Sequence, residues 1–136
     1  MKHFKIDEFV KSQTATAHSI QNVPSAEAVR NLELLVSRVL DPLREAWGGP
    51  IIITSGYRCE ALNARVGGVK NSYHTRGMAA DIRPQNGFVD KLYLLIGRMF
   101  VTRKMGITEC YIDRVRGYIH IAYDAEECNT WPFLST

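Results

Sequence analysis

The stretch SYHTRGMAAD at residues 72–81, together with His120 further along the chain, predicts most about this protein. It holds an imidazole and a carboxylate, His74 and Asp81, and His120 adds a second imidazole. Two imidazoles and a carboxylate are a ligand set that a catalytic zinc ion uses, with a fourth position left open. These residues therefore predict a metal-activated hydrolase in which His74, Asp81 and His120 hold the ion.

The residues between the first two ligands agree with a turn near a metal. Gly77 lets the chain turn, and Ala79 and Ala80 are small enough to pass close beneath the ion before Asp81 returns on a short strand. Taken singly, a loop histidine, a strand-end carboxylate and a sheet histidine are ordinary structural residues. Their combination with Ser-Gly-Tyr-Arg at 55–58 favours a metal site.

In three motifs the chain resembles the zinc D-alanyl-D-alanine carboxypeptidase family: SGYR at 55–58, SxHxxGxAxD at 72–81, and His120 on a short hydrophobic strand. The resemblance covers roughly residues 4–123. That family includes vancomycin-resistance dipeptidases and phage endolysins, and it shares a zinc-site fold with lysostaphin-type peptidases and the hedgehog signalling domain. The resemblance implies a small α+β domain whose antiparallel sheet carries the zinc ligands and is flanked by helices.

The resemblance also implies the substrate and the residues that bind it. Arg58 matches the family arginine that binds a substrate carboxylate or the developing oxyanion, and a guanidinium suits this role because it stays charged and donates in a fixed fork. Ser72 either donates to substrate or caps the loop. The implied substrate is a peptidoglycan stem peptide, cut by a D,D-carboxypeptidase or an endopeptidase.

Hydrolysis also needs a base that takes a proton from water and passes it to the leaving amine. Family members carry an acid three residues before the last zinc histidine, where this chain has Gly117. Related zinc folds place the acid further upstream, so Asp113 is the predicted base, unless it only starts a β-turn. The alternative acids are Glu109, Asp124 and Glu126.

A predicted β-hairpin places several of these side chains on one face. With a symmetric turn, Tyr111 lies opposite His120 and Asp113 lies opposite Tyr118. Because directly opposite residues share a face, Asp113 becomes a diagonal neighbour of His120, and Glu109 falls on the same side.

The hydrophobic pattern predicts the other elements. Apolar residues at three-and-four spacing from Val29 to Trp47 predict a long helix that ends at Gly48 and is kinked or divided at Pro42. A short helical or irregular segment precedes it. The further predicted elements are strands at 50–54, 78–83, 108–113 and 118–123 and helices at 59–66 and 88–103.

Composition predicts one soluble domain over residues 1–136. The chain has 46% apolar and 23% charged residues, and no repeat or linker divides it. Its net charge of +3 comes from scattered Lys and Arg, so we predict no nucleic-acid partner. No apolar run reaches the ~20 residues of a membrane span, so we predict no membrane partner. The sequence leaves the oligomeric state open.

The compartment is predicted from the first residues, MKHFKIDE, which carry charges where a secretory signal would need an apolar stretch. We therefore expect synthesis in the bacterial cytoplasm and action on the cell wall after lysis or injection, as for a phage or prophage lysis protein. Cys59, Cys110 and Cys128 form no C-x-x-C pair, which favours reduced structural thiols.

Two other functions are compatible with these residues. A zinc-stabilised binding module for the cell wall or a protein would keep the metal site and dispense with the acid missing at position 117. A cytoplasmic D-Ala-D-Ala dipeptidase would need a more enclosed pocket. Zinc is the default metal, although the ligand set also suits other divalent ions. Four aromatic residues are predicted either to line a peptide groove or to pack: Tyr57, Tyr73, Tyr118 and Trp131.

Overall fold

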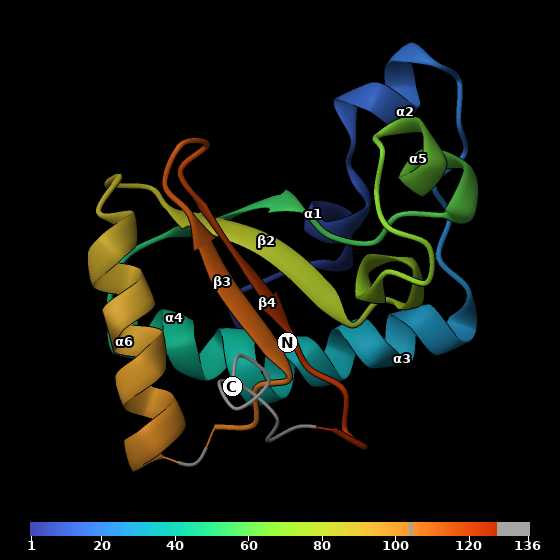
Figure 1. Cartoon of the computed structure of the whole chain (residues 1–136). Coiled ribbons are helices and arrows are strands. Elements are labelled where there is room, and N and C mark those ends of the chain that lie inside the picture. Colours follow the sequence, from blue (N-terminus) through green and yellow to red (C-terminus); the bar gives the residue numbers. More distant parts are fainter. Residues whose placement is uncertain (104, 128–136) are drawn as a thin grey trace.

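The computed structural model describes residues 1–103 and 105–127, which are built around a four-stranded antiparallel sheet with the order β1-β2-β4-β3. The strands are β1 (Ile51–Ser55), β2 (Ala79–Pro84), β3 (Glu109–Asp113) and β4 (Tyr118–Ala122). Helices flank this sheet (Figure 1). The predicted α+β class is confirmed, and each strand predicted from the sequence is present.

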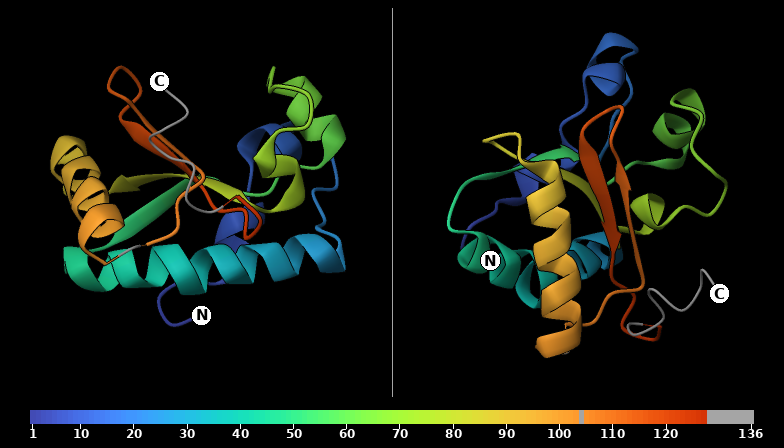
Figure 2. Two further views of the ribbon diagram at one scale, coloured as in Figure 1. Left: turned by 60° about the horizontal axis from the view of Figure 1, so that its bottom comes forward. Right: turned by 60° about the vertical axis from the view of Figure 1, so that its left-hand side comes forward.

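A long helical path crosses one face of the sheet (Figure 2). It consists of α3 (Ala26–Leu35), the π-helical turn η1 (Val36–Leu40) and α4 (Asp41–Trp47). The Ser25 hydroxyl accepts a hydrogen bond from the Ala28 amide at 3.1 Å, and Gly48 ends the path at φ 77°. The break predicted at Pro42 takes the form of this wider turn just before it, because proline has no amide hydrogen to donate.

The hydrophobic core lies between this helical path, α6 (Val89–Thr102) and the inner face of the sheet. Many of its large members are fully buried, and each of these stabilises the fold by about 1.5–3 kcal/mol. They include Leu32, Leu35, Leu40, Leu43, Ile82, Leu92, Ile96 and Ile119. Since side chains alternate along a strand, every second residue points to the outer face of the sheet, away from this core.

Short helices gather at one end of the sheet (Figure 1). They are α1 (Ile6–Val10), α2 (Gln13–Ala17), α5 (Glu60–Arg65) and the 3₁₀ turn η2 (Tyr73–Arg76). The sequence predicted α5 and left the segment of α1 as helical or irregular. It did not predict α2, whose few residues carry no hydrophobic period and depend on the Ser12 cap. No helix in the described part of the chain has the length and apolar character needed to span a bilayer.

The strand register confirms the predicted hairpin. Tyr111 pairs with His120, and Asp113 pairs with Tyr118. On the other side of β4, Asp81 of β2 pairs with His120. Tyr111, His120 and Asp81 therefore form a row across three neighbouring strands on one face. The expectation that the sheet carries the metal ligands is correct for Asp81 and His120, whereas His74 lies on η2 beside the sheet.

Candidate metal centre

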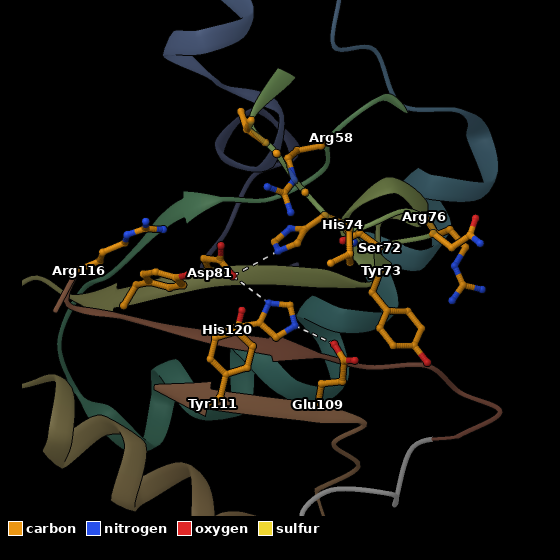
Figure 3. Close-up of a pocket in the computed structure, with 16 residues that line it drawn as sticks. Arg58, Ser72, Tyr73, His74, Arg76, Asp81, Glu109, Tyr111, Arg116 and His120 are labelled. Carbon is orange, nitrogen blue, oxygen red and sulfur yellow. Dashed lines mark hydrogen bonds and ion pairs between the residues drawn. The ribbon is translucent and has the colours of Figure 1, made fainter. Parts of the chain in front are cut away.

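His74, Asp81 and His120 converge on one point at the outer face of the sheet (Figure 3). Asp81 Oδ1 lies 3.3 Å from His74 Nε2 and 3.0 Å from His120 Nδ1. One ligand atom from each residue can be chosen so that all lie within 4.8 Å of one another. Both imidazoles are buried, with His74 at 2% and His120 at 6% exposure. The structure thus brings together the predicted ligand set.

The η2 turn orients His74 through its backbone. The Ser72 hydroxyl accepts a hydrogen bond from the His74 amide at 3.1 Å, which is the capping role predicted as one of its two alternatives. Gly77 follows in the left-handed region at φ 75°, and a Cβ there would lie 2.3 Å from the carbonyl oxygen of Ala28. The turn predicted at Gly77 is confirmed by this left-handed conformation at the end of η2. The small size of Gly77 serves the contact with α3.

The Ser-Gly-Tyr-Arg segment holds the other edge of the His74 ring. The carbonyl of Gly56 accepts a hydrogen bond from His74 Nδ1 at 2.7 Å. A Cβ on Gly56 would lie 2.5 Å from the carbonyl oxygen of Phe9, so α1 leaves room only for glycine. The amide of Tyr57 donates to that same oxygen at 2.7 Å. A register shift between Ile53 and Ser55 lies in the last part of β1, directly before this segment.

Asn22 is a structural residue of the site that the sequence did not reveal. Its side-chain amide donates to the carbonyls of Val10 at 3.0 Å and Tyr57 at 2.9 Å, and its oxygen accepts from the Cys59 amide at 2.7 Å. It thereby ties the segment that carries Arg58 to the N-terminal helices. Residues so distant in sequence give no local signal of this contact.

The hairpin holds His120 with side chains. Glu109 Oε1 lies 2.9 Å from His120 Nε2, and the Tyr111 ring stacks on the imidazole with 4.7 Å between centroids and 18° between planes. The sequence indicated Glu109 as an alternative base but did not reveal its hydrogen bond to His120. The hairpin parity was the signal that placed it on the His120 face.

Hydrogen bonds within the cluster shift the pKa values of Asp81 and His120. Burial alone would raise the pKa of Asp81, but hydrogen bonds with His120 and His74 outweigh it and lower this pKa to about 2. Burial alone would lower the pKa of His120, but its hydrogen bonds with Asp81 and Glu109 raise it to about 9. Without a metal, the site therefore holds an ionised carboxylate beside a protonated imidazole, and a bound cation would replace that proton.

The chemistry of these donors fits a divalent cation such as zinc. His74 Nε2, Asp81 Oδ1 and His120 Nδ1 face one another, and the remaining nitrogen of each imidazole is already hydrogen-bonded, to the Gly56 carbonyl and to Glu109. Histidines that bind metals usually make such an outer hydrogen bond, which fixes the ring. Three protein ligands also leave a position open for substrate or water.

The ligands lie at the base of a pocket of about 630 Å³. Other residues that line it include Arg58, Ser72, Tyr73, Glu109, Tyr111 and Tyr118. The Arg58 guanidinium is directed toward His74 (Figure 3), and its buried Nε has no hydrogen-bond partner among the described residues. Burial lowers the pKa of Arg58, although Asp81 opposes this effect. A half-buried cation with an unpaired donor suits an anionic group of a ligand.

Asp113, the predicted base, is not among the residues that line this pocket. Its Oδ1 accepts a hydrogen bond from the Arg116 amide at 2.9 Å, which is the β-turn role named as its alternative. Gly117 follows in the left-handed region at φ 76° and completes the turn. Asp113 precedes the turn that leads to Tyr118, which does line the pocket, and its catalytic role stays a prediction.

The other acids and aromatic residues are divided between sites. Asp124 and Glu126 line a separate hollow near Arg76. Tyr73 and Tyr118 line the pocket of the metal centre, and Tyr57 lines a neighbouring one. Trp131 and Cys128 lie outside the described residues.

A His-Asp-His cluster that could hold a metal ion, beneath a pocket that Arg58 also lines, has the donor set of a metal-dependent hydrolase. The family model for peptidase M15 matches residues 2–122, so the chain belongs to the M15 family of zinc D-Ala-D-Ala carboxypeptidase-type peptidases. This membership confirms the resemblance seen in the sequence. A comparison with curated proteins finds no match.

Proposed function

We propose that this protein is a zinc metallopeptidase that hydrolyses peptidoglycan stem peptides as a D,D-carboxypeptidase or an endopeptidase. The observation that carries the proposal is the convergence of His74, Asp81 and His120 under a pocket that Arg58 also lines. Membership of the M15 family supports a peptide as substrate. The protein would be made in the bacterial cytoplasm, as part of a phage or prophage lysis system, and would reach the wall after lysis or injection.

The residues around the pocket would bind and orient the peptide. A zinc ion, when bound, supplies Lewis acidity toward a carbonyl oxygen. Arg58 would donate hydrogen bonds to a substrate carboxylate or to the oxyanion that develops at the scissile carbonyl. Burial, followed by the effect of Tyr118, raises the pKa of Tyr111 to about 12, so its hydroxyl keeps its proton at neutral pH and can donate. The Ser72 hydroxyl, which accepts from the His74 amide, would donate its own hydrogen to substrate.

The pocket shape favours an extended peptide over a free dipeptide. A second hollow of about 500 Å³ adjoins the metal pocket, and Arg58 and Val66 line both. The second hollow is also lined by Lys11, Ser12 and Thr14, which offer polar groups to a longer chain. Two adjoining pockets of this kind suit a stem peptide that continues on one side of the scissile bond.

For proton transfer we propose Asp113, which would take a proton from water and return it to the leaving amine. Its strand position shares a face with His120, and its partner Tyr118 lines the pocket. The carboxylate would have to turn from the Arg116 amide toward the pocket. Glu109 is the alternative candidate for the base, but it is hydrogen-bonded to the edge of the His120 ring that faces away from Asp81.

One observation favours a second candidate function, a zinc-stabilised module that binds the cell wall or a protein without hydrolysis. Among the described residues that line the pocket, the acids are Asp81 and Glu109, and both are already hydrogen-bonded to His120. A site without a free carboxylate would retain metal and ligand binding but would lack a base.

The experiment that separates the two functions measures zinc content and muropeptide hydrolysis on the same preparations. We expect one zinc per chain and turnover that stops on chelation. Asp113→Asn should keep zinc and lose turnover, whereas His120→Ala should lose both. Zinc-replete wild type that cleaves nothing in a panel of crosslinked muropeptides and stem peptides would reject the peptidase and favour the binding module.

A further inference from the structure

The two histidines of the metal centre present different nitrogens to it. His74 Nε2 and His120 Nδ1 both approach Asp81 Oδ1, at 3.3 Å and 3.0 Å. The other edge of the His120 ring therefore faces away from the ligand cluster. Glu109 lies at that edge, with Oε1 2.9 Å from Nε2, as the dashed line in Figure 3 shows.

We propose that Glu109 is a positioning residue that holds His120 with Nδ1 turned toward the metal. Its carboxylate accepts the hydrogen on Nε2, which leaves the lone pair on Nδ1 as the donor to a cation. A carboxylate behind a ligating histidine fixes both the tautomer and the ring orientation. The inference rests on the metal site of the proposed function and does not depend on the peptidase reaction.

The strand register places Glu109 in this position. Glu109 pairs with Ala122, and Tyr111 pairs with His120, so Glu109 is the diagonal neighbour of His120 across the β3–β4 ladder. The Tyr111 ring covers one face of the imidazole at 4.7 Å. His120 is thus held at one edge by Asp81, at the opposite edge by Glu109 and on one face by Tyr111.

The same geometry argues against Glu109 as the base for hydrolysis. A base has to lie within hydrogen-bond reach of the proton that it removes. The His120 ring separates the Glu109 contact at Nε2 from the cluster of ligand atoms at Nδ1. A carboxylate that remains in this contact supports a ligand, and the proton-transfer role is left to Asp113.

Zinc affinity tests the inference directly. The metal-free protein is titrated with zinc against a chromophoric chelator, for wild type, Glu109→Ala and Glu109→Gln. We expect Glu109→Ala to bind zinc about 10–100-fold more weakly. Glu109→Gln keeps a carbonyl oxygen that can accept from Nε2, so it should recover most of that loss. Glu33→Gln, an exposed change on α3, is the matched control and should equal wild type.

A second readout reports the ring itself. In zinc-loaded wild type, long-range ¹H–¹⁵N NMR spectra should show the His120 hydrogen on Nε2, and in Glu109→Ala that signal should broaden or shift while the His74 signals stay. Equal zinc affinity in wild type and Glu109→Ala, with an unchanged His120 signal, would overturn the inference.

These outcomes are independent of catalysis. A protein that cleaves no peptide but binds zinc more weakly in Glu109→Ala rejects the proposed peptidase and supports Glu109 as a positioning residue. A variant Glu109→Ala that binds zinc like wild type yet loses turnover when fully loaded overturns the inference and assigns Glu109 to catalysis.

Discussion

The two histidines reach the same carboxylate from regions that are built differently. The loop arm (residues 55–58 and 72–77) orients His74 through contacts that involve the main chain: the Ser72 hydroxyl accepts from the His74 amide, and the Gly56 carbonyl accepts from the His74 ring. The hairpin arm (residues 109–122) orients His120 through side chains, namely Glu109 at one edge and Tyr111 on one face.

Because the two arms are held differently, we expect substitutions in one to affect mainly folding stability and substitutions in the other to affect mainly metal affinity. The loop arm is packed against α3 and α1 at positions where only glycine fits, so changes there should cost folding free energy first. The hairpin arm is held by side chains that reach the ligand from the pocket wall, so changes there should alter metal affinity before they alter the fold. The following predictions test that separation.

The largest effect is expected where the arms meet, at Asp81. Asp81→Asn removes the charge that both imidazoles share, and a first ligand should matter more than its supporting residues, whose loss costs about 10–100-fold. We expect zinc affinity to fall by more than about a hundredfold, with peptide hydrolysis lost. Isothermal titration with zinc measures this, and Asp7→Asn on the exposed side of α1 is the control. Retained tight zinc binding would contradict the assigned ligand set.

Two glycines allow the arms to be compared by one substitution. Gly77 and Gly117 have nearly equal positive φ angles, 75° and 76°. A Cβ added at Gly77 would lie 2.3 Å from the carbonyl oxygen of Ala28, whereas a Cβ added at Gly117 would have no neighbour within 4 Å. Gly117→Ala should lose about 1 kcal/mol from the left-handed backbone alone. Gly77→Ala should lose about 3 kcal/mol because the clash with α3 adds to it. Urea unfolding of the metal-free variants measures both, and equal losses would contradict the packing difference.

The pH dependence of the metal-free protein follows from the shifted pKa values. His120 has a folded pKa of about 9 against an ordinary 6.5, so its contribution is complete below 6.5 and is lost as the pH rises through 9. Asp81 has a folded pKa of about 2 against 3.8, so its contribution is complete above 3.8 and is lost as the pH falls through 2. Stability from this pair should therefore be greatest between about pH 4 and 6.5.

The hairpin arm should modify that profile. We expect metal-free wild type to lose roughly 2 kcal/mol of unfolding free energy between pH 6.5 and 9.5. Glu109→Gln removes one of the two carboxylates that raise the pKa of His120, so its loss over the same range should be smaller. Urea unfolding at several pH values measures the slopes. Identical slopes in the two proteins would show that Glu109 does not act on His120.

The smallest effect is expected from the ring that covers His120. Tyr111→Ala removes the stacked contact, which at about 0.5–1.5 kcal/mol corresponds to a few-fold weaker zinc binding. Tyr111→Phe keeps the ring and should bind zinc like wild type. Competition titration against a chelator resolves such differences, and a loss in Tyr111→Phe equal to that in Tyr111→Ala would assign the effect to the hydroxyl.

The hairpin arm was largely predictable from sequence. Side chains on paired strands alternate with a period of two, so the register of one turn was enough to place Tyr111, Asp113 and Glu109 on the face of His120. What the sequence left open was how each acid is used. Glu109 is hydrogen-bonded to His120, and Asp113 accepts from the Arg116 amide in the turn.

The sequence indicated which residues of the loop arm matter, but it did not reveal the tertiary contacts that they make. The sequence singled out His74, the turn at Gly77 and the Ser-Gly-Tyr-Arg segment, but it did not reveal that Gly77 packs against Ala28 of α3. The partners of His74 and Asn22 are also distant along the chain.

By itself, then, the sequence determined the strands, the long helix, the ligand types and the hairpin register, because these depend on local periodicity and on the chemistry of single residues. The tertiary structure decided which atoms meet. Backbone packing between α1, α3 and η2 selects glycine at two positions, and the approach of three elements fixes which nitrogen of each histidine faces Asp81. Such contacts join segments that are far apart in sequence, so no local pattern can specify them.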